Sequence, residues 1–364
     1  MTISSPSEVQ RRDALADRLY QATIGAFDLE AIYIGDRLGL YRALAEGGPA
    51  TSVELADRAG IAERYAREWL EHQAVGAILD VDDAGRPPDA RRYSLPAGHT
   101  EVLVDPDSFS TMTPMARFVV AGAQLMPQLL EAYRTGGGVA SDASEDAFEA
   151  QDAVNRPAFA ALLATEWIPA LADVDARMRS EPTKVADVAC GTGRSTMAIA
   201  RGYPLARVDG LDLDPGSIER ANRSLAAAPE LRDRVTFAAR DAADPALSGR
   251  YDLVTIIEAL HDMSRPIEVL RACRGLLGPG GAVLVVDEKV AESFVAPGDS
   301  TERLMYSYSV LFCLANGLAE TPSAGTGTVM RPETVGRYAR EAGFESVTIV
   351  PVEHDTFRFY RLDP

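Results

Sequence analysis

The sequence has few cysteines, and none of them is spaced as a disulfide or metal-binding motif. The three are Cys190, Cys273 and Cys313, and no two of them form a CxxC pair. An odd number without such spacing argues against a disulfide framework or a cysteine-rich zinc site and is typical of reduced thiols. We therefore expect a cytoplasmic protein.

Basic charge is also scarce. The 36 lysines and arginines stand against 54 acidic residues, which gives a formal net charge of −18. Nucleic acids and anionic membranes bind clustered positive charge, so we expect neither as a partner. No apolar run is long enough to span a bilayer. The first residues, M-T-I-S-S-P-S-E, lack the charged and apolar regions of a signal peptide.

The most informative stretch is residues 185–195, which read V-A-D-V-A-C-G-T-G-R-S. They predict a buried strand, a glycine-rich turn and the start of a helix. Gly191 and Gly193 allow the backbone to pass close to a ligand, and the helix start offers unpaired N–H groups to an anion. Asp187, at the end of the strand, differs from a dinucleotide-binding turn, which needs bare backbone against a pyrophosphate. An acid there suits a cation, such as an amino-acid ammonium group.

Two further acids follow the next two predicted strands. Asp212 lies in the strand 206–213, 25 positions after Asp187, and an acid at this point of a βαβ unit commonly holds ribose hydroxyls. Asp241 follows the strand 235–239, where it can accept a hydrogen bond from an exocyclic amine such as that of adenine. Two glycines and one acid would be a weak signal of a nucleotide site, but the whole set in this order is a stronger one. The alternative is a Rossmann domain that binds NAD or no ligand.

The segment 185–290 resembles the core of class I S-adenosylmethionine-dependent methyltransferases. The resemblance implies S-adenosyl-L-methionine as cofactor and assigns seven residues to it. Asp187 would lie near the methionine amine, Gly191 and Gly193 under the methionine–ribose part, Asp212 on the ribose diol, and Asp241 with Ala242 at the adenine. The seventh is Leu213, next to Asp212. One departure is Ala189, which stands where the family usually has the first glycine of its loop.

The first half of the chain is organised differently. Helices are predicted at 11–34, 34–45, before Gly60 and at 63–74, and two short strands at 78–81 and 92–95. Three helices followed by a small hairpin describe a winged helix. In its candidate recognition helix, acidic residues offset Arg64 and Arg67, which argues against reading of DNA. A winged-helix regulator that senses the cofactor is the rival interpretation.

A winged helix followed by this core resembles the small-molecule O-methyltransferases of plants and of bacterial secondary metabolism. The resemblance implies a homodimer formed through the N-terminal domain. We expect an α/β fold, a Rossmann-like seven-stranded methyltransferase sheet preceded by a mostly helical winged-helix dimerisation domain. The expected domains are 1–105 for dimerisation, 106–180 for connecting helices that form part of the substrate pocket, and 181–364 for cofactor binding.

The candidate catalytic residue is His261. It follows the predicted strand 251–257, at the edge of the sheet where a methyl acceptor should lie. The O-methyltransferases carry a His–Asp pair at this point, so the resemblance implies that His261 is a base. Glu288, after the strand 282–287, matches the first supporting glutamate of that family, whereas Val329 occupies the place of the second. The alternative is that His261 only packs or caps the loop.

Methyl transfer from a sulfonium is an in-line displacement, which requires alignment of the reactants and removal of the proton from a hydroxyl acceptor. We therefore predict methylation of a hydroxyl on a hydrophobic or aromatic small molecule. C- or N-methylation and a non-methylating use of the fold are the alternatives. His261 and Asp262 could supply two metal ligands, but no histidine lies in 289–330, so we predict no metal.

Overall fold

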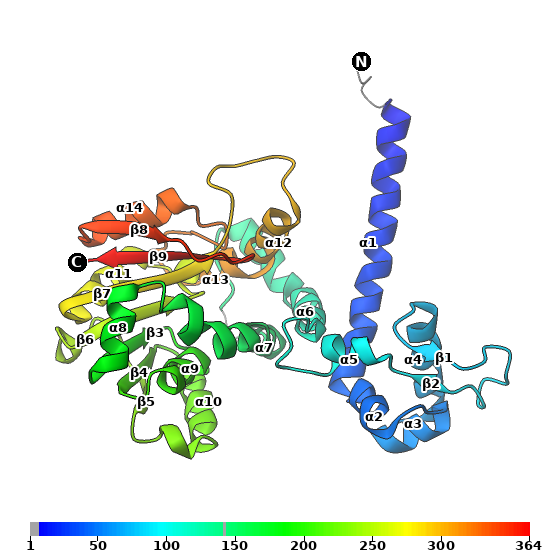
Figure 1. The fold of residues 1–364 in the computed structure, drawn as a ribbon. Coiled ribbons are helices and arrows are strands. Elements are labelled where there is room, and N and C mark those ends of the chain that lie inside the picture. The colour runs from blue at the N-terminus through cyan, green and yellow to red at the C-terminus, as the bar shows by residue number, and fades with distance from the viewer. Residues whose placement is uncertain (1–6, 141–142) are drawn as a thin grey trace, which may run out of the picture. The chain divides into compact units, whose positions relative to one another are not determined.

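The computed structural model describes residues 7–140 and 143–364, and the chain forms two compact units (Figure 1). Unit 1 comprises Met1–Gln124 and Ser144–Pro157, and unit 2 comprises Leu125–Ala143 and Ala158–Pro364. The expectation of no signal peptide concerns the chain's start, where residues 1–6 lie outside the described part. The predicted connecting segment 106–180 contributes to both units, and the division at 105 and 180 stays a prediction.

Two helices pass from one unit to the other. They are α6 (Thr113–Thr135) and α7 (Glu145–Leu162), and each has a proline inside it, Pro127 in α6 and Pro157 in α7. An internal proline removes a helical hydrogen bond and often bends a helix. In α7 the boundary between the units falls directly after that proline.

Unit 1 has the predicted order of helices and hairpin. Its remaining elements are α1 (Glu8–Arg37), α2 (Leu40–Gly47), α3 (Ser52–Ala59), α4 (Glu63–Val75), β1 (Asp80–Val81), β2 (Tyr93–Ser94) and α5 (Ala97–Leu103). Strands β1 and β2 pair antiparallel, with Val81 opposite Tyr93. Thr51 and Glu54 form a capping box that starts α3.

The predicted break at residue 34 is wrong, because α1 continues to Arg37 as one helix of 30 residues. Gly35 lies inside it, and a Cβ atom there would stand 2.6 Å from the rings of both Trp69 and Tyr41. Glycine at this position therefore allows close packing of α1 on α4 and α2. The helix ends instead before Gly39, whose φ of 66° is left-handed.

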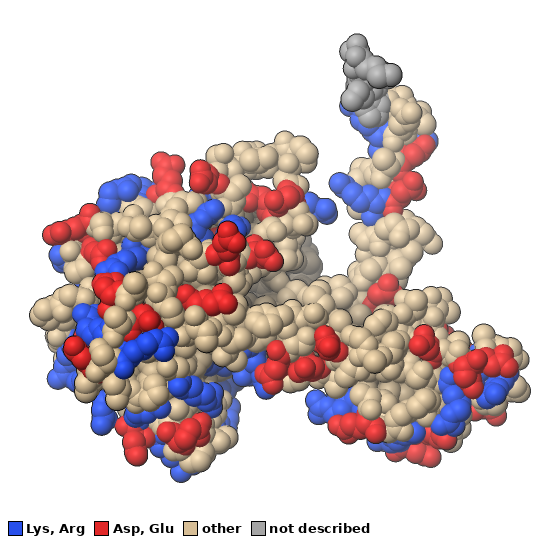
Figure 2. All heavy atoms as spheres, viewed as in Figure 1, with Lys and Arg blue, Asp and Glu red and all other residues tan. Residues whose placement is uncertain are grey.

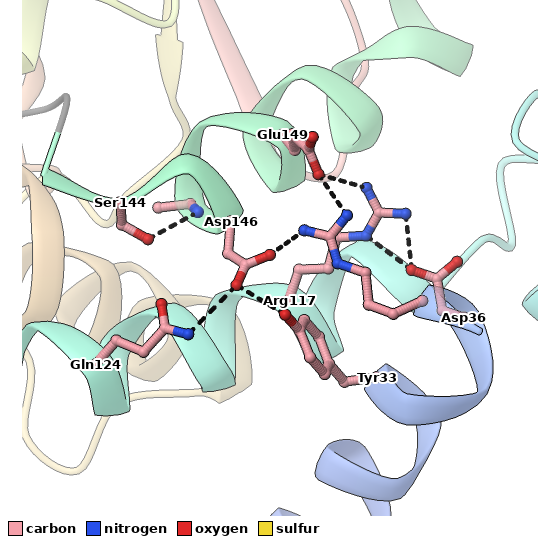
Figure 3. Close-up of polar contacts among 9 residues, drawn as sticks. Tyr33, Asp36, Arg117, Gln124, Ser144, Asp146 and Glu149 are labelled. Carbon is pink, nitrogen blue, oxygen red and sulfur yellow. Dashed lines mark hydrogen bonds and ion pairs between the residues drawn. The ribbon is translucent and has the colours of Figure 1, made fainter. Parts of the chain in front are cut away.

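A network of charged side chains joins α1, α6 and α7 within unit 1 (Figure 3). Arg37 of α1 pairs with Asp146 and with Glu149 of α7. Arg117 of α6 pairs with Asp36, at a distance of 2.7 Å between Nη2 and Oδ2. Because these partners lie 81 to 112 positions apart in the chain, the network is a tertiary feature of unit 1.

Unit 2 is built on a seven-stranded sheet, in the order β5-β4-β3-β6-β7-β9-β8. The first five of these strands are parallel, and β9 pairs antiparallel with β7 and with β8. The strands are β3 (Thr183–Val188), β4 (Ala206–Asp212), β5 (Val235–Ala239), β6 (Tyr251–Ile257), β7 (Leu277–Glu288), β8 (Ser346–Val350) and β9 (Phe357–Asp363). The predicted fold class is confirmed.

Helices cover both faces of this sheet. Neighbouring strand residues point to opposite faces, so Val185 joins a core that includes α8 and α9, whereas Ala186 joins one that includes α11 and α14. The helices of unit 2 are α8 (Ala172–Ser180), α9 (Arg194–Gly202), α10 (Pro215–Ala226), α11 (Pro266–Leu276), α12 (Ser300–Tyr308), α13 (Leu314–Gly317) and α14 (Pro332–Ala342). A π-helical turn follows α7 at Leu163–Trp167, and another joins α12 to α13 at Ser309–Cys313.

No single helix in the described part of the chain is both long and apolar enough to cross a bilayer. One pair of helical segments, Glu145–Trp167 and Ala172–Ser180, meets the length and composition requirement jointly, with a bend of 96° between them.

The network in Figure 3 predicts the effect of removing one cation. In Arg37→Met, the stem of the side chain is retained but the charge is lost, and the largely buried carboxylate of Asp146 loses its cation. We expect unit 1 to lose about 1–2 kcal/mol of unfolding free energy, measured by denaturant titration of Trp69 fluorescence in a Trp167→Phe background. Arg64→Met, which removes an exposed pair with Glu68, is the control and should change stability little. Equal losses in the two variants would contradict the prediction.

Candidate active site

The five parallel strands end at one edge of the sheet, and polar residues gather there. They are Asp187 at the end of β3, Asp212 at the end of β4, Asp241 after β5, His261 after β6, and Asp287 with Glu288 at the end of β7. In open α/β sheets this edge is where ligands bind. The predicted cofactor and catalytic residues therefore lie on the same side of unit 2.

The glycine-rich turn has a left-handed backbone at Ala189, Gly191 and Gly193, with φ values of 58°, 53° and 79°. A Cβ atom on Gly193 would lie 2.3 Å from the ring of Phe237, so only glycine fits there. A Cβ on Gly191 would have no atom of the described chain within 4 Å, its two sequence neighbours apart, which leaves room for a ligand against that backbone. Ala189 adopts the turn at a cost of about 1–2 kcal/mol.

Asp187 is 1% exposed, and its carboxylate contacts the chain's own hydroxyl groups. Ser195 and Thr196, at the start of α9, donate to Oδ2, and Thr255 of β6 donates to Oδ1, each at 2.6 Å. Burial raises the pKa of Asp187, and the three hydroxyl donors lower it by less. Asp187 thus ties the strand before the glycine turn to the helix after it. Its contact with a methionine amine stays a prediction.

Asp212 is tied to the same turn from the other side. Its Oδ2 accepts a hydrogen bond from the Gly191 N–H at 2.9 Å, and its Oδ1 accepts one from the Asp214 N–H at 2.9 Å. Burial raises the pKa of Asp212. Each carboxylate oxygen can accept a second hydrogen bond, so this residue fits a ribose diol. The open space at Gly191 and the Asp212 carboxylate together suit the ribose part of the cofactor.

The other residues predicted to bind the cofactor lie at the adjacent strand ends. Leu213 is an exposed apolar side chain, and Ala242 is buried. The exposed carboxylate of Asp241 accepts a hydrogen bond from the Ala243 N–H at 2.8 Å. Their contacts with the cofactor stay predictions.

His261 lies in the 3-10 turn Leu260–Asp262 that follows β6, and it is 3% exposed. Its Nδ1 atom is 2.8 Å from Oδ1 of Asp287, and its Nε2 atom is 3.3 Å from Oδ1 of Asp262. The expectation that Glu288 orients this ring is therefore corrected, because Asp287 does so. Adjacent strand residues point to opposite faces, and the Glu288 N–H donates a hydrogen bond to Oδ1 of Asp287 at 2.9 Å.

These carboxylates decide the protonation state of the ring. Burial lowers the pKa of His261, but the charges of Asp287 and Asp262 raise it more, and the net pKa is well above the ordinary value of 6.5. The protonated imidazole is favoured at neutral pH. A protonated ring cannot accept another proton, so a base role requires that the proton at Nε2 first leave.

Glu288 is buried at the same edge, and its Oε2 atom has no hydrogen-bond partner among the residues that the structure describes. Burial and the nearby charge of Glu258 raise its pKa well above the ordinary value. Glu258 is the first residue after β6 and has a left-handed φ of 51°. Non-glycine residues in this region are strained, and such strain is concentrated at functional sites. The position of Glu258 after the strand was the only sequence indication of its place in the site.

Cys313 is a second residue that the sequence did not indicate. The π-helical turn Ser309–Cys313 brings it to the histidine, so that ligand atoms of His261, Asp262 and Cys313 all lie within 4.8 Å of one another. The predicted absence of a third metal ligand rested on the lack of histidine in 289–330. The thiol at position 313 was overlooked, so that reason does not stand.

Comparison with known families finds two matches. Residues 186–283 match the family model described as a methyltransferase domain, and residues 29–105 match the one described as an Rv2258c-like winged HTH domain. The predicted order of a winged helix and a methyltransferase core is confirmed.

Individual relatives agree with these matches. A ubiquinone biosynthesis O-methyltransferase of Thiobacillus denitrificans is 29% identical over 194 residues, which cover 52% of this chain and 77% of that protein. The mitomycin 7-O-methyltransferase MmcR has a similar fold, with a TM-score of 0.67 at 20% identity over 97% of this chain and 98% of that one. Human N-acetylserotonin methyltransferase, solved with S-adenosylmethionine, gives a TM-score of 0.70 at 17% identity over 100% and 99%.

The contact between His261 and Asp287 predicts a measurable pH effect. In Asp287→Asn the negative charge at Nδ1 is lost, so the pKa of His261 should fall, as followed by NMR of its ring proton, with His261→Gln used for assignment. Because the pKa of His261 is higher in the folded state than the unfolded value of 6.5, its protonation stabilises the fold. This stabilisation is complete below pH 6.5 and is lost as the pH rises through the folded-state pKa. Asp287→Asn should therefore lose stability mainly at low pH. Asp241→Asn is the control, and an unchanged His261 titration in Asp287→Asn would refute the contact.

Proposed function

We propose that this chain, an S-adenosylmethionine-dependent methyltransferase with a winged-helix domain, transfers a methyl group to a hydroxyl oxygen of a hydrophobic or aromatic small molecule. The observation that carries the proposal is the buried His261–Asp287 pair at the end of β6. Strand β6 is the neighbour of β3, whose end opens the glycine turn. Ionisable groups that can act on a hydroxyl therefore lie beside the proposed cofactor site.

The residues of the proposed site hold the cofactor in position for methyl transfer. The cofactor supplies a methyl group activated by its sulfonium. The glycine turn and Asp212 hold the ribose part, and Asp241 with Ala242 holds the adenine. Alignment of the two reactants contributes much of the rate in such displacements.

We propose His261 and Glu288 as the catalytic residues. His261, oriented by Asp287, activates the acceptor hydroxyl, because a neutral hydroxyl is a poor nucleophile. The Glu288 carboxyl is buried at the same edge and within the electrostatic influence of His261. Because its pKa is raised, this carboxyl is suited to donate a hydrogen bond rather than to take a proton. Methylation of a carbon or a nitrogen does not require removal of a hydroxyl proton, so it would not need this pair of residues.

We also propose that the chain forms a homodimer through its N-terminal domain. The middle of α1, residues 19–27, carries no charged side chain, and Figure 2 shows this part of the helix as uncharged surface. Leu19 and Phe27 are 57% and 60% exposed. On α4, Arg64 pairs with Glu68 and Arg67 with Glu63, which supports dimerisation over DNA binding.

Two further expectations remain proposals. The division into 1–105, 106–180 and 181–364 separates dimerisation, substrate pocket and cofactor binding. A cytoplasmic location is supported by cysteine usage, because Cys190, Cys273 and Cys313 are all free thiols.

Cofactor binding tests the proposed site directly. Calorimetric titration of the wild type with S-adenosylmethionine should show one saturable site per chain. In Asp212→Ala the affinity should fall about 10–100-fold, because hydrogen bonds to a charged acceptor are lost. Asp209→Ala is the matched control, since Asp209 lies on the same strand but bonds Thr236 and Tyr251. Absence of heat with the wild type would overturn the proposed cofactor site.

The same preparation is then screened against hydroxylated aromatic acceptors, with His261→Ala as the inactive reference. NMR of the product distinguishes a methyl group on oxygen from one on carbon or nitrogen. Methylation on carbon or nitrogen alone would reject the hydroxyl proposal and leave the cofactor site intact.

The dimer proposal predicts that charge on α1 separates the subunits. Sedimentation equilibrium should give a dimer for the wild type and a monomer for Leu19→Glu/Phe27→Glu, because an unpaired carboxylate is costly to bury in an apolar interface. Tyr65→Glu, at an exposed position on α4, is the control and should stay dimeric. A monomeric wild type, or a double variant that remains dimeric, would show that α1 is not the interface.

A further inference from the structure

We propose that Glu258 and Glu288 bind an ammonium group of the methyl acceptor, so that hydroxylated aromatic amines are the favoured substrate class. This rests on the proposed function, because it adds a second point of contact to the site around His261. Glu258 is the first residue after β6, and Glu288 is the last residue of the neighbouring strand β7. The hydroxyl would lie at the histidine and the ammonium at the two carboxyl groups.

The register of the two strands brings these residues together. Ile257 pairs with Val286, and the N–H of Glu258 donates to the Val286 carbonyl oxygen at 2.8 Å. Because the strands are parallel, Glu258 and Glu288 both lie at the edge of the sheet where ligands bind. Glu258 is partly exposed, so a ligand can reach the pair from solvent.

A buried oxygen without a partner independently indicates a ligand. Glu288 is 8% exposed, and within residues 7–140 and 143–364 its Oε2 atom has no hydrogen-bond partner. Buried carboxyl oxygens are normally bonded to a donor. An ammonium group carries three N–H donors, so it can bond this oxygen and the carboxylate of Glu258 together.

The charge of the pair also favours a cation. Burial raises the pKa of Glu288, and the charge of Glu258 raises it further. Two carboxyl groups that interact in this way share a proton, which leaves one negative charge on the pair. Asp287 offsets the protonated ring of His261, so the charge of the pair is left for a ligand.

The surroundings supply no competing cation and one aromatic ring. In the part of the chain that the structure describes, no lysine or arginine is among the groups that act most strongly on Glu288. Lys289 follows it directly, but Nζ donates to the carbonyl oxygen of His354 at 2.8 Å. Burial and the charges of Glu288 and Glu258 raise the pKa of Tyr308 on α12. This ring near both carboxyl groups suits an aromatic amine.

The test compares ligands that differ only in charge. Tyramine is compared with para-propylphenol, in which a methyl group replaces the ammonium, and meta-tyramine with meta-propylphenol. Binding is measured by calorimetry on the full-length protein saturated with S-adenosylhomocysteine. The wild type should bind at least one amine about 10–100-fold more tightly than its neutral counterpart, because hydrogen bonds to a charged group are gained.

Glu258→Gln should remove most of this preference. The matched control is Glu292→Gln, which removes an exposed carboxylate from the segment after β7 and should keep the preference. Both variants change the net charge equally, so the control accounts for the general attraction of a cation to a chain with a net charge of −18. Circular dichroism confirms that each variant is folded.

The proposal is overturned if no amine binds more tightly than its neutral counterpart, or if the preference persists in Glu258→Gln. Methylation of the neutral phenols and binding of S-adenosylmethionine by the wild type report on the proposed function separately. A wild type that methylates para-propylphenol on oxygen but prefers neither amine would therefore reject the ammonium site and retain the proposed function.

Discussion

The buried carboxylate of Asp187 is the contact on which the active edge of the sheet depends. A buried charge is costly unless it receives hydrogen bonds, and Asp187 receives three, from Ser195, Thr196 and Thr255. These donors belong to the first turn of α9 and to β6, so the carboxylate connects β3 to both. The glycine turn between β3 and α9 is thereby held in its left-handed course, and Asp212 fastens it from the neighbouring strand.

The second constraint is the position of His261 between two carboxylates. Asp287 holds one ring nitrogen and Asp262 lies beside the other, in a place from which solvent is nearly excluded. The charges of these two carboxylates raise the pKa of His261 and favour the protonated ring. Activation of an acceptor hydroxyl by this ring therefore requires that the proton at Nε2 leave first.

Unit 1 is held together by different means. Its core contains close contacts such as those of Gly35 with Trp69 and Tyr41, and the paired charges of Arg37 and Arg117 connect helices far apart in the chain. The long α1 leaves apolar side chains exposed, and this is why dimerisation is proposed for it. The match to a winged HTH domain agrees with the helices and hairpin that periodicity predicted, whereas the acid–base pairs on α4 do not favour a nucleic-acid surface.

The sequence by itself determined the strands of the sheet, the glycine turn at Gly191 and Gly193, and the acids at the strand ends. Each of these is a local pattern that can be recognised within one segment of the chain. It did not determine which carboxylate meets His261. Asp287 and Glu288 are adjacent in sequence, and only the register of β7 against its neighbours decides which one faces the ring. Cys313 and Glu258 reach the same site through a π-helical turn and a strained residue, neither of which has a periodic signature. Only the tertiary structure decides these contacts, because they depend on how segments far apart in the sequence pack against one another.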